Sequence, residues 1–279
     1  MKPEDITRQS KSNFTLSFFF LSAKRKNAMV HFYAFSRVVD DAVDEHEAQE
    51  AQELIQFWKN EVRLCYTGRP THPISIALQK SIQDFTIPQK YLDLIIEGCE
   101  QDIHKKRYAT MDELRAYCYR VASVIGLVSM RIFGLVSETA DKAAEELGLA
   151  LQYTNILRDI KDDAQRDRIY IPQAELQRYK ISESQIMSGQ PSDKKLKLLL
   201  KIFADRAETH FQRAFTLLKQ LPRRPLVAAW IMGKVYFAIL KKIQKSHYDV
   251  YSQKIKISRH KKLFIAIKEL FHAILKNKA

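Results

Sequence analysis

The amino-acid sequence predicts an all-α fold in one domain over residues 1–279, and three observations lead to this prediction. Glycine and proline number only 7 and 8, whereas residues that favour helices are abundant. Apolar residues recur at the three-to-four-residue spacing of one helix face along most of the chain. The chain shows no alternation of strand and helix patterns, no internal repeat and no segment typical of a domain linker.

Helical boundaries follow from residues that begin or end helices. Gly68 and Pro70 end one helix, and Pro88 begins another near its first position. Pro172 lies beyond a third helix and cannot continue it. The polar stretch 179–193 is expected to be a surface loop. On this basis we expect helices at 14–45, 48–67, 74–83, 89–103, 111–134, 138–163, 193–219, 225–247 and 258–276.

Cysteine usage and the apolar segments indicate the compartment. Three cysteines, an odd number without metal-ligand spacing, are typical of a reduced cytosolic protein. The apolar run 14–23 resembles the core of a signal peptide, but Glu4 and Asp5 precede it and the helical pattern continues through it. No apolar run approaches the roughly 20 residues that span a bilayer. We therefore expect a cytoplasmic protein.

Positive charge is concentrated towards the C-terminal end. The net charge is +14, and from Lys241 onward eleven Lys or Arg residues stand against two acidic residues, which leaves nine of these excess charges there. Segment 258–279 predicts a basic amphipathic helix, with Ile265 as its one misplaced apolar residue. Its apolar arc consists of Leu263, Phe264, Ile267, Leu270, Phe271, Ile274 and Leu275. Two interpretations stay open: peripheral contact with an anionic membrane at its inner face, or packing of the arc on the domain.

The first motif with chemical content is "HFYAFSRVVDDAVDE" at 31–45. In a helix, residues three and four apart share a face, so Asp40 and Asp44 lie together, with Asp41 beside them and Arg37 one turn earlier. A single D-x-x-x-D pattern is usually a solvated helix face. The functional interpretation therefore needs a second acidic stripe.

A second acidic stripe lies in the expected helix 138–163. The chain reads "LRDIKDDAQRDRIYIP" from residue 157 in this helix to residue 172 beyond it. Its members share one face at helical spacing, whereas the flanking residues are apolar; they are Gln152, Asn155, Asp159 and Asp163, with Arg158 alongside. Two such stripes on facing helices would hold four or more carboxylates around one cavity. Like charges repel at that range unless cations lie between them.

The expected cation is Mg²⁺, or Mn²⁺ in its place. Oxygen ligands suit Mg²⁺, which binds through a few carboxylates, keeps waters and bridges to substrate phosphates. Arg37 and Arg158 would then bind phosphate oxygens through paired N–H groups. The charged loop expected at 161–168 would fold over a diphosphate as a lid, with Arg166 and Arg168 in contact with it; ordinary solvated loop charges are the alternative.

These motifs resemble the squalene and phytoene synthase family. "YAFSRVVDDAVDE" and "LALQYTNILRDIKDDAQRDRIYIP" resemble its two signature motifs, and "LRAYCYRVASVIGLVSMRIFG" at 114–134 resembles its helix with a tyrosine and a small-residue kink. The amino-acid sequence of the third segment is most similar to those of bacterial presqualene diphosphate synthases. The resemblance implies a single-domain helical bundle of the class I isoprenoid synthase type with a central active-site cavity.

The resemblance also implies roles for individual residues. Metal ligands would be Asp40, Asp41, Asp44, Asn155, Asp159 and Asp163. Substrate would be bound by Ser10, Lys11, Ser12, Arg37, Gln152, Asn155, Arg158, Arg166, Arg168 and Tyr236. Catalytic roles fall to Arg37 and Arg158 and to Tyr33 and Tyr117, whose π-faces would stabilise a cation, although each tyrosine could instead be ordinary core. Asp102 fits either a supporting role at this site or a local ion pair.

The implied reaction is a Mg²⁺-dependent head-to-head condensation of two prenyl diphosphates, with two farnesyl diphosphates giving presqualene diphosphate. Phytoene synthase, which joins two geranylgeranyl diphosphates, and squalene synthase are the enzymatic alternatives. NADPH is not expected, because no G-x-G-x-x-G or P-loop motif is present.

A basic helical protein that binds membrane or nucleic acid without catalysis is the alternative from another class. It accounts for the positive charge but not for two carboxylate stripes, so nucleic acid is not expected as a partner. The sequence leaves both the prenyl chain length and the oligomeric state open.

Overall fold

The structure is a computed structural model that describes residues 3–9, 21–189, 193–252 and 254–275. These residues form helices and no strand, which confirms the all-α prediction; one isolated bridge joins Arg107 and Ile169. The helices are α1 Pro3–Gln9, α2 Ala23–Asp44, α3 Ala48–Thr67, α4 Pro73–Phe85, α5 Gln89–His104, α6 Met111–Cys118, α7 Val124–Ile132, α8 Glu138–Gln165, α9 Gln173–Arg178, α10 Glu183–Ser188, α11 Lys194–Leu218, α12 Val227–Lys245 and α13 Arg259–Leu275.

Most predicted helices begin and end within two residues of the observed ones, because their caps are local. The polar stretch 179–193 is a correction, since it contains α10. Ser182 caps this short helix in a capping box with Gln185, and polar residues at those positions begin a helix as readily as they form a loop. The predicted helix 14–45 begins, among the described residues, at Ala23.

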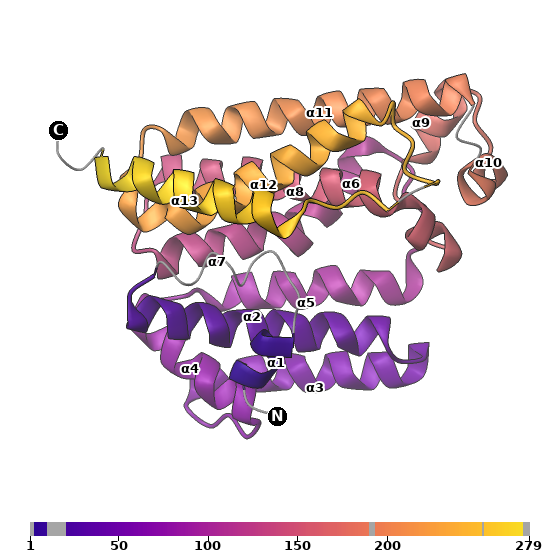
Figure 1. The fold of residues 1–279 in the computed structure, drawn as a ribbon. Helices are drawn as coiled ribbons and strands as arrows, with labels where there is room; N and C mark the ends of the chain where they lie inside the picture. Colours follow the sequence, from indigo (N-terminus) through magenta and orange to yellow (C-terminus); the bar gives the residue numbers. More distant parts are fainter. Residues whose placement is uncertain (1–2, 10–20, 190–192, 253, 276–279) are drawn as a thin grey trace.

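The helices pack in two groups, which are joined by α7 and the π-helical turn that precedes it (Figure 1). Helices α2 to α5 pack on one another in the lower half of the view, and α8, α11, α12 and α13 form the upper half. Helix α7 and the π-helical turn Tyr119–Ser123 contact both α5 and α8. In the described part of the chain, every α-helix contributes buried apolar residues to one cluster, while the assignment of a single domain stays a prediction.

The π-helical turn is held by two glycines on neighbouring helices. A Cβ on Gly148 of α8 would lie 2.4 Å from the Cα of Ser123, and a Cβ on Gly98 of α5 would lie 2.7 Å from Cγ1 of Val121. Only glycine permits this close approach. The tight contact brings α5 and α8 together on either side of the turn, and both helices carry acidic residues towards their C-terminal ends.

Among the described residues, no helix is both long enough and apolar enough to span a membrane.

Candidate active site

The first acidic motif lies at the C-terminal end of α2, where Arg37 pairs with its own helix. Its Nε donates to Asp41 Oδ2 at 3.0 Å, and its Nη1 donates to Asp40 Oδ2 at 3.2 Å. The Asp40 side chain is 52% exposed, and the charges of Asp44, Asp41 and Asp102 act on it. Desolvation and the charge of Asp44 raise the pKa of Asp40 to about 6.

The second acidic motif lies on α8 and repeats this arrangement. Arg158 forms a two-point ion pair with Asp159, in which Nε donates to Oδ1 at 2.8 Å. Asn155 donates through Nδ2 to Gln152 Oε1 at 3.3 Å, whereas its buried Oδ1 has no hydrogen-bond partner. Desolvation and the charge of Asp159 raise the pKa of Asp163 to about 7. The predicted polar stripe is therefore present, with one buried oxygen left to bind a ligand.

Two arginines that follow α8 connect the motifs. Arg166 Nη1 donates to Asp44 Oδ2 at 3.1 Å, and Arg168 Nη1 donates to Asp44 Oδ1 at 2.8 Å. The Arg168 side chain is 11% exposed and that of Arg166 is 59% exposed. The acidic end of α2 and the C-terminal end of α8 therefore lie side by side, as the two-motif prediction requires.

The expected lid at 161–168 is partly a correction. Helix α8 continues to Gln165, so only the last residues of that segment form a turn, at which Asp167 has a positive φ of 57°. Arg107 holds this turn in place, with Nη2 donating to Asp167 Oδ1 at 2.7 Å. The backbone bridge between Arg107 and Ile169 follows directly. The turn is tied to the chain after α5 and reaches the first motif through its arginines.

Asp102, near the C-terminal end of α5, lies between the two motifs. Burial raises its pKa to about 6, against the opposing effect of Arg168, and the charge of Asp44 raises it further. The same Asp102 charge raises the pKa values of Asp40 and Asp163. Of the two interpretations of Asp102, the structure therefore supports the active-site one.

Tyr117 belongs to an aromatic cluster around Asp102. Its hydroxyl donates to Asp102 Oδ2 at 2.7 Å and lies 3.3 Å from the hydroxyl of Tyr170. The rings of Tyr117 and Tyr170 stack at 5.4 Å, and Tyr108 packs against both. This hydroxyl orients the Asp102 carboxylate. Tyr117 is not among the residues that line the apolar cavity, and its predicted role beside a cation stays a prediction.

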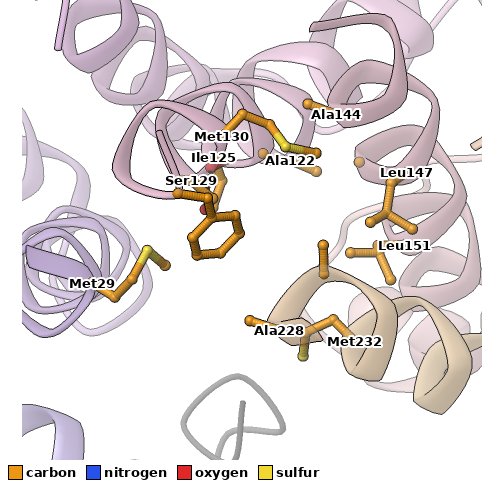
Figure 2. A pocket seen from close by; sticks show the side chains of 14 residues that line it. Met29, Ala122, Ile125, Ser129, Met130, Ala144, Leu147, Leu151, Ala228 and Met232 are labelled. Carbon is orange, nitrogen blue, oxygen red and sulfur yellow. Dashed lines mark hydrogen bonds between the residues drawn. The ribbon is translucent and has the colours of Figure 1, made fainter. Parts of the chain in front are cut away.

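An apolar cavity lies between α2, α7, α8 and α12, as Figure 2 shows. Its empty volume is about 520 Å³, part of it open to solvent. The side chains that line it are almost entirely apolar: Met29, Ala122, Ile125, Gly126, Ser129, Met130, Phe133, Ala144, Leu147, Gly148, Leu151, Ala228, Ala229 and Met232. Met29 of α2 and Met232 of α12 lie on opposite sides of it.

The cavity and the acidic cluster are consecutive along the same two helices. On α2, Met29 lines the cavity and Asp40 follows 11 residues later, about 16 Å along the axis. On α8, Leu151 lines the cavity, and Asn155, Asp159 and Asp163 follow at one-turn spacing. The site is therefore elongated, with one apolar end and one acidic end.

The donor set fits a divalent metal. No three His, Cys, Asp or Glu side chains in the described ranges already lie at metal-binding separation. Most of the carboxylates face arginines instead, and the pKa values of Asp40, Asp102 and Asp163 are raised by burial and mutual repulsion. A cation would relieve that repulsion, and the unpartnered Asn155 Oδ1 adds a neutral oxygen ligand.

The remaining predicted site residues lie at the N-terminal end of the chain, on α2 and on α12. Ser10, Lys11 and Ser12 lie outside the described residues. Tyr33 is half-buried and lies one helical turn before Arg37 on α2. Against desolvation, Asp159 raises the pKa of the Arg158 guanidinium, and Tyr236 on α12, which hydrogen-bonds to Arg158, raises it further. Tyr236 is thereby the residue through which α12 reaches the second motif.

With this geometry in place, comparison with known proteins decides the family. A model described as "Squalene/phytoene synthase" matches residues 7–261. The chain belongs to the squalene/phytoene synthase family. Members of this family are prenyltransferases, and they condense prenyl diphosphates head to head.

Several curated relatives of this chain are named as phytoene synthases. The chain is 30% identical to phytoene synthase 1 of Solanum lycopersicum, over 93% of this chain and 64% of the relative. It is 32% identical to the enzyme of Narcissus pseudonarcissus, over 93% of this chain and 63% of the relative. The 15-cis-phytoene synthase of Synechocystis is 29% identical, over 92% and 80%. The chain thus spans somewhat less than two thirds of the length of these plant relatives.

Two solved structures similar to this chain carry the names dehydrosqualene synthase and squalene synthase. A dehydrosqualene synthase in complex with a ligand is 26% identical and superposes with a TM-score of 0.85, covering 99% of this chain and 95% of that chain. The squalene synthase HpnC of Alicyclobacillus acidocaldarius is also 26% identical, with a TM-score of 0.83 over 88% and 93%. The predicted fold type is confirmed.

One residue of the candidate site, Asp102, has a larger part in the structure than its sequence pattern alone indicated. Asp102 follows Ile95 and Cys99 at helical spacing, so it continues the apolar face of α5. A carboxylate on a buried face needs a partner or a function. The helical spacing of Ile95, Cys99 and Asp102 was therefore the sequence pattern that could have identified Asp102 as a functional residue.

Proposed function

We propose that this chain catalyses a Mg²⁺-dependent head-to-head condensation of two prenyl diphosphates, with two farnesyl diphosphates giving presqualene diphosphate. One observation carries the proposal. Helices α2 and α8 both run from an apolar cavity to an acidic cluster, which matches a substrate with an apolar tail and a charged diphosphate.

The proposed metal ligands are those of the two motifs: Asp40, Asp41 and Asp44 from α2, and Asn155, Asp159 and Asp163 from α8. Mg²⁺, when bound, neutralises charge on the leaving diphosphate and lowers the barrier to breaking the allylic C–O bond. Asp102 with Tyr117 acts as a positioning pair, because it keeps a further negative charge between the motifs and fixes Arg168.

The arginines have two proposed states. Without ligand, Arg37, Arg158 and Arg168 are occupied by Asp41, Asp159 and Asp44, respectively. Once the carboxylates bind cations, the guanidinium groups lose much of that attraction and are free to bind diphosphate oxygens as planar forks. The same exchange applies to Arg166, the most exposed of the four.

The apolar cavity has the task of excluding water. Departure of diphosphate leaves an allylic cation, and the 2,3 double bond of the second substrate supplies the electron pair for the new carbon–carbon bond. Loss of a proton then closes the cyclopropane ring. Water would capture the cation, so a cavity walled by alkyl side chains protects the reaction. NADPH is not required for these steps.

Phytoene synthesis from two geranylgeranyl diphosphates is the second candidate. The curated relatives named as phytoene synthases favour it, whereas the structural neighbours named as dehydrosqualene and squalene synthases favour the shorter substrate. We rank farnesyl diphosphate as the first candidate because the third sequence motif, "YRVASVIGLVSMRIFG", resembles that of bacterial presqualene diphosphate synthases.

The test is incubation of the purified chain with C15 or C20 prenyl diphosphate and Mg²⁺, with and without NADPH, followed by product identification. A C30 cyclopropyl diphosphate without NADPH is the expected product. A C40 product from C20 substrate alone would select the second candidate. No condensation product from either substrate, with Mg²⁺ or Mn²⁺ present, would reject the proposal.

A further inference from the structure

Helix α13 packs on α12 through a face that the apolar pattern does not reveal. The residues of α13 buried against the rest of the protein are Ala266, Glu269 and Ala273, and Ile265 is half-buried beside them. Glu269 is 4% exposed and forms an ion pair with Arg223. Arg223 in turn lies over the Trp230 ring at 4.0 Å. A buried ion pair thus fixes the rotation of α13 about its axis.

This rotation turns the apolar arc outwards. Six residues of α13 are 51–68% exposed: Leu263, Phe264, Ile267, Phe271, Ile274 and Leu275. In the described part of the chain they are six of the eleven large apolar side chains that are exposed. The interpretation in which the arc packs on the domain is therefore wrong for all of its residues except the half-buried Leu270. A contiguous exposed apolar stripe of this kind marks an interaction surface.

The charges around the stripe define its partner. Arg259, Lys261 and Lys268 of α13 are exposed, and Lys268 and Lys261 border the apolar arc at helical spacing. The helix contains one acidic residue, Glu269, which is buried and neutralised by Arg223. The exposed side of α13 is therefore apolar along its middle and positive along its border.

We propose that α13 docks on an anionic membrane surface, with its apolar stripe among the acyl chains and its lysines at the headgroups. A second copy of the chain fits less well, because Glu269, the one acidic residue of α13, is buried, so a two-fold contact between copies of α13 offers these lysines no opposite charge. Nucleic acid fits less well, because a phosphate backbone offers nothing to an apolar stripe.

Docking in this orientation places the cavity close to the membrane. The meaning of this position for substrate entry rests on the proposed function. Helix α12 lies directly against α13 (Figure 1), and its Ala228, Ala229 and Met232 line the apolar cavity. The cavity is thus one helix away from the proposed lipid surface. Substrates and products with long prenyl tails partition into bilayers, so this position shortens their path.

The test is co-sedimentation of the full chain with vesicles, without substrate or metal. Vesicles of equal parts phosphatidylglycerol and phosphatidylcholine are compared with pure phosphatidylcholine. The test variant is F264Q/I267Q/F271Q, and its matched control is I76Q/V136Q/L198Q, whose residues are 52%, 67% and 49% exposed elsewhere on the protein. A second variant, K261E/K268E, reverses the border charge.

We expect the wild-type chain and the matched control to sediment with anionic vesicles. F264Q/I267Q/F271Q should lose at least about tenfold in partitioning with an unchanged melting temperature, because its side chains are already exposed. K261E/K268E should lose at least about tenfold on anionic vesicles only.

Three results would overturn the proposal: no sedimentation of the wild-type chain, equal loss in the matched control, or a wild-type dimer that F264Q/I267Q/F271Q dissociates. Vesicle binding is measured without turnover, so failure of the proposed function would leave this result intact.

Discussion

Arg168 donates a 2.8 Å hydrogen bond from Nη1 to Oδ1 of Asp44, a residue 124 positions earlier in the chain. This contact joins the last turn of α2 to the segment after α8. Its partner Arg166 contacts the other oxygen of the same carboxylate but is 59% exposed, against 11% for Arg168. The two arginines therefore differ in burial while they share a partner, which makes them a natural matched pair.

Arg168→Met should destabilise the fold, and Arg166→Met should not. Loss of Arg168 leaves Asp44 and Asp102 without their shared positive neighbour, at a cost of about 1–3 kcal/mol. An exposed ion pair contributes at most about 1 kcal/mol, so Arg166→Met should change stability by less than that. Urea unfolding monitored by circular dichroism measures both. Equal effects of the two changes would show that the buried contact is not special.

Tyr117→Phe should lower stability by about 1–2 kcal/mol, because it removes the donor that contacts Asp102 at 2.7 Å. Tyr108 offers the control in the same cluster, since its buried hydroxyl has no hydrogen-bond partner. Tyr108→Phe should therefore be neutral or slightly stabilising. Thermal unfolding of the two variants compares them directly. A larger loss in Tyr108→Phe would contradict the hydrogen-bond assignment.

Asp40→Asn and Asp163→Asn should each reduce turnover by several orders of magnitude and raise the melting temperature in EDTA by a few degrees. The gain arises because each change removes a charge that its neighbours repel. Asp159→Asn should also reduce turnover, but it loses the pair with Arg158 and should not be stabilised. Asp162 is the matched control, because it is half-exposed and pairs with Lys254. Near-wild-type turnover in Asp40→Asn with Mg²⁺ present would disprove the two-motif site.

The pH dependence of stability should reverse sign when metal and diphosphate are added. Asp40 and Asp163 have pKa values raised to about 6 and about 7, so the folded state binds their protons more tightly than the unfolded state does. The contribution of these two groups to stability in EDTA should therefore rise as the pH falls from about 7 to about 4. Metal needs ionised carboxylates, so stabilisation by Mg²⁺ with inorganic diphosphate should be complete above about pH 7 and lost below about pH 6.

Melting temperatures measured in both buffers across this range provide the check. The difference between the two buffers is the decisive quantity, because protein groups that contact neither the metal nor the diphosphate contribute equally to both, and the titration of diphosphate itself is measured separately. A Mg²⁺ effect that stays constant between about pH 5 and pH 8 would show that these carboxylates do not bind the metal.

Ala229→Leu should shift the substrate preference towards shorter prenyl chains. Ala229 lines the cavity from α12, so a larger side chain reduces the space for the tail. Turnover with C20 diphosphate should fall more than turnover with C15 diphosphate. Ala238→Leu on the same helix is the control, since Ala238 is equally half-buried but does not line the cavity. An unchanged preference in Ala229→Leu would assign the tail to another part of the protein.

Much of this site could be predicted because its residues are close in sequence. Asp40 and Asp44, like Asn155, Asp159 and Asp163, share a face through helix geometry alone. The helix boundaries are equally local, which is why most were predicted closely. The expected lid failed in part because α8 continues through Gln165, and nothing in a charged stretch rules out a further helical turn.

Tertiary structure alone decided the rest, because those features depend on contacts between distant segments. Asp102 takes its role from Tyr117 of α6 and from Arg168 and Tyr170 of the segment after α8, which are two later parts of the chain. The outward face of α13 was decided by a pair between Glu269 and Arg223, 46 residues apart. Periodicity identifies which residues of a helix share a face, but only a partner elsewhere in the chain determines which face is buried.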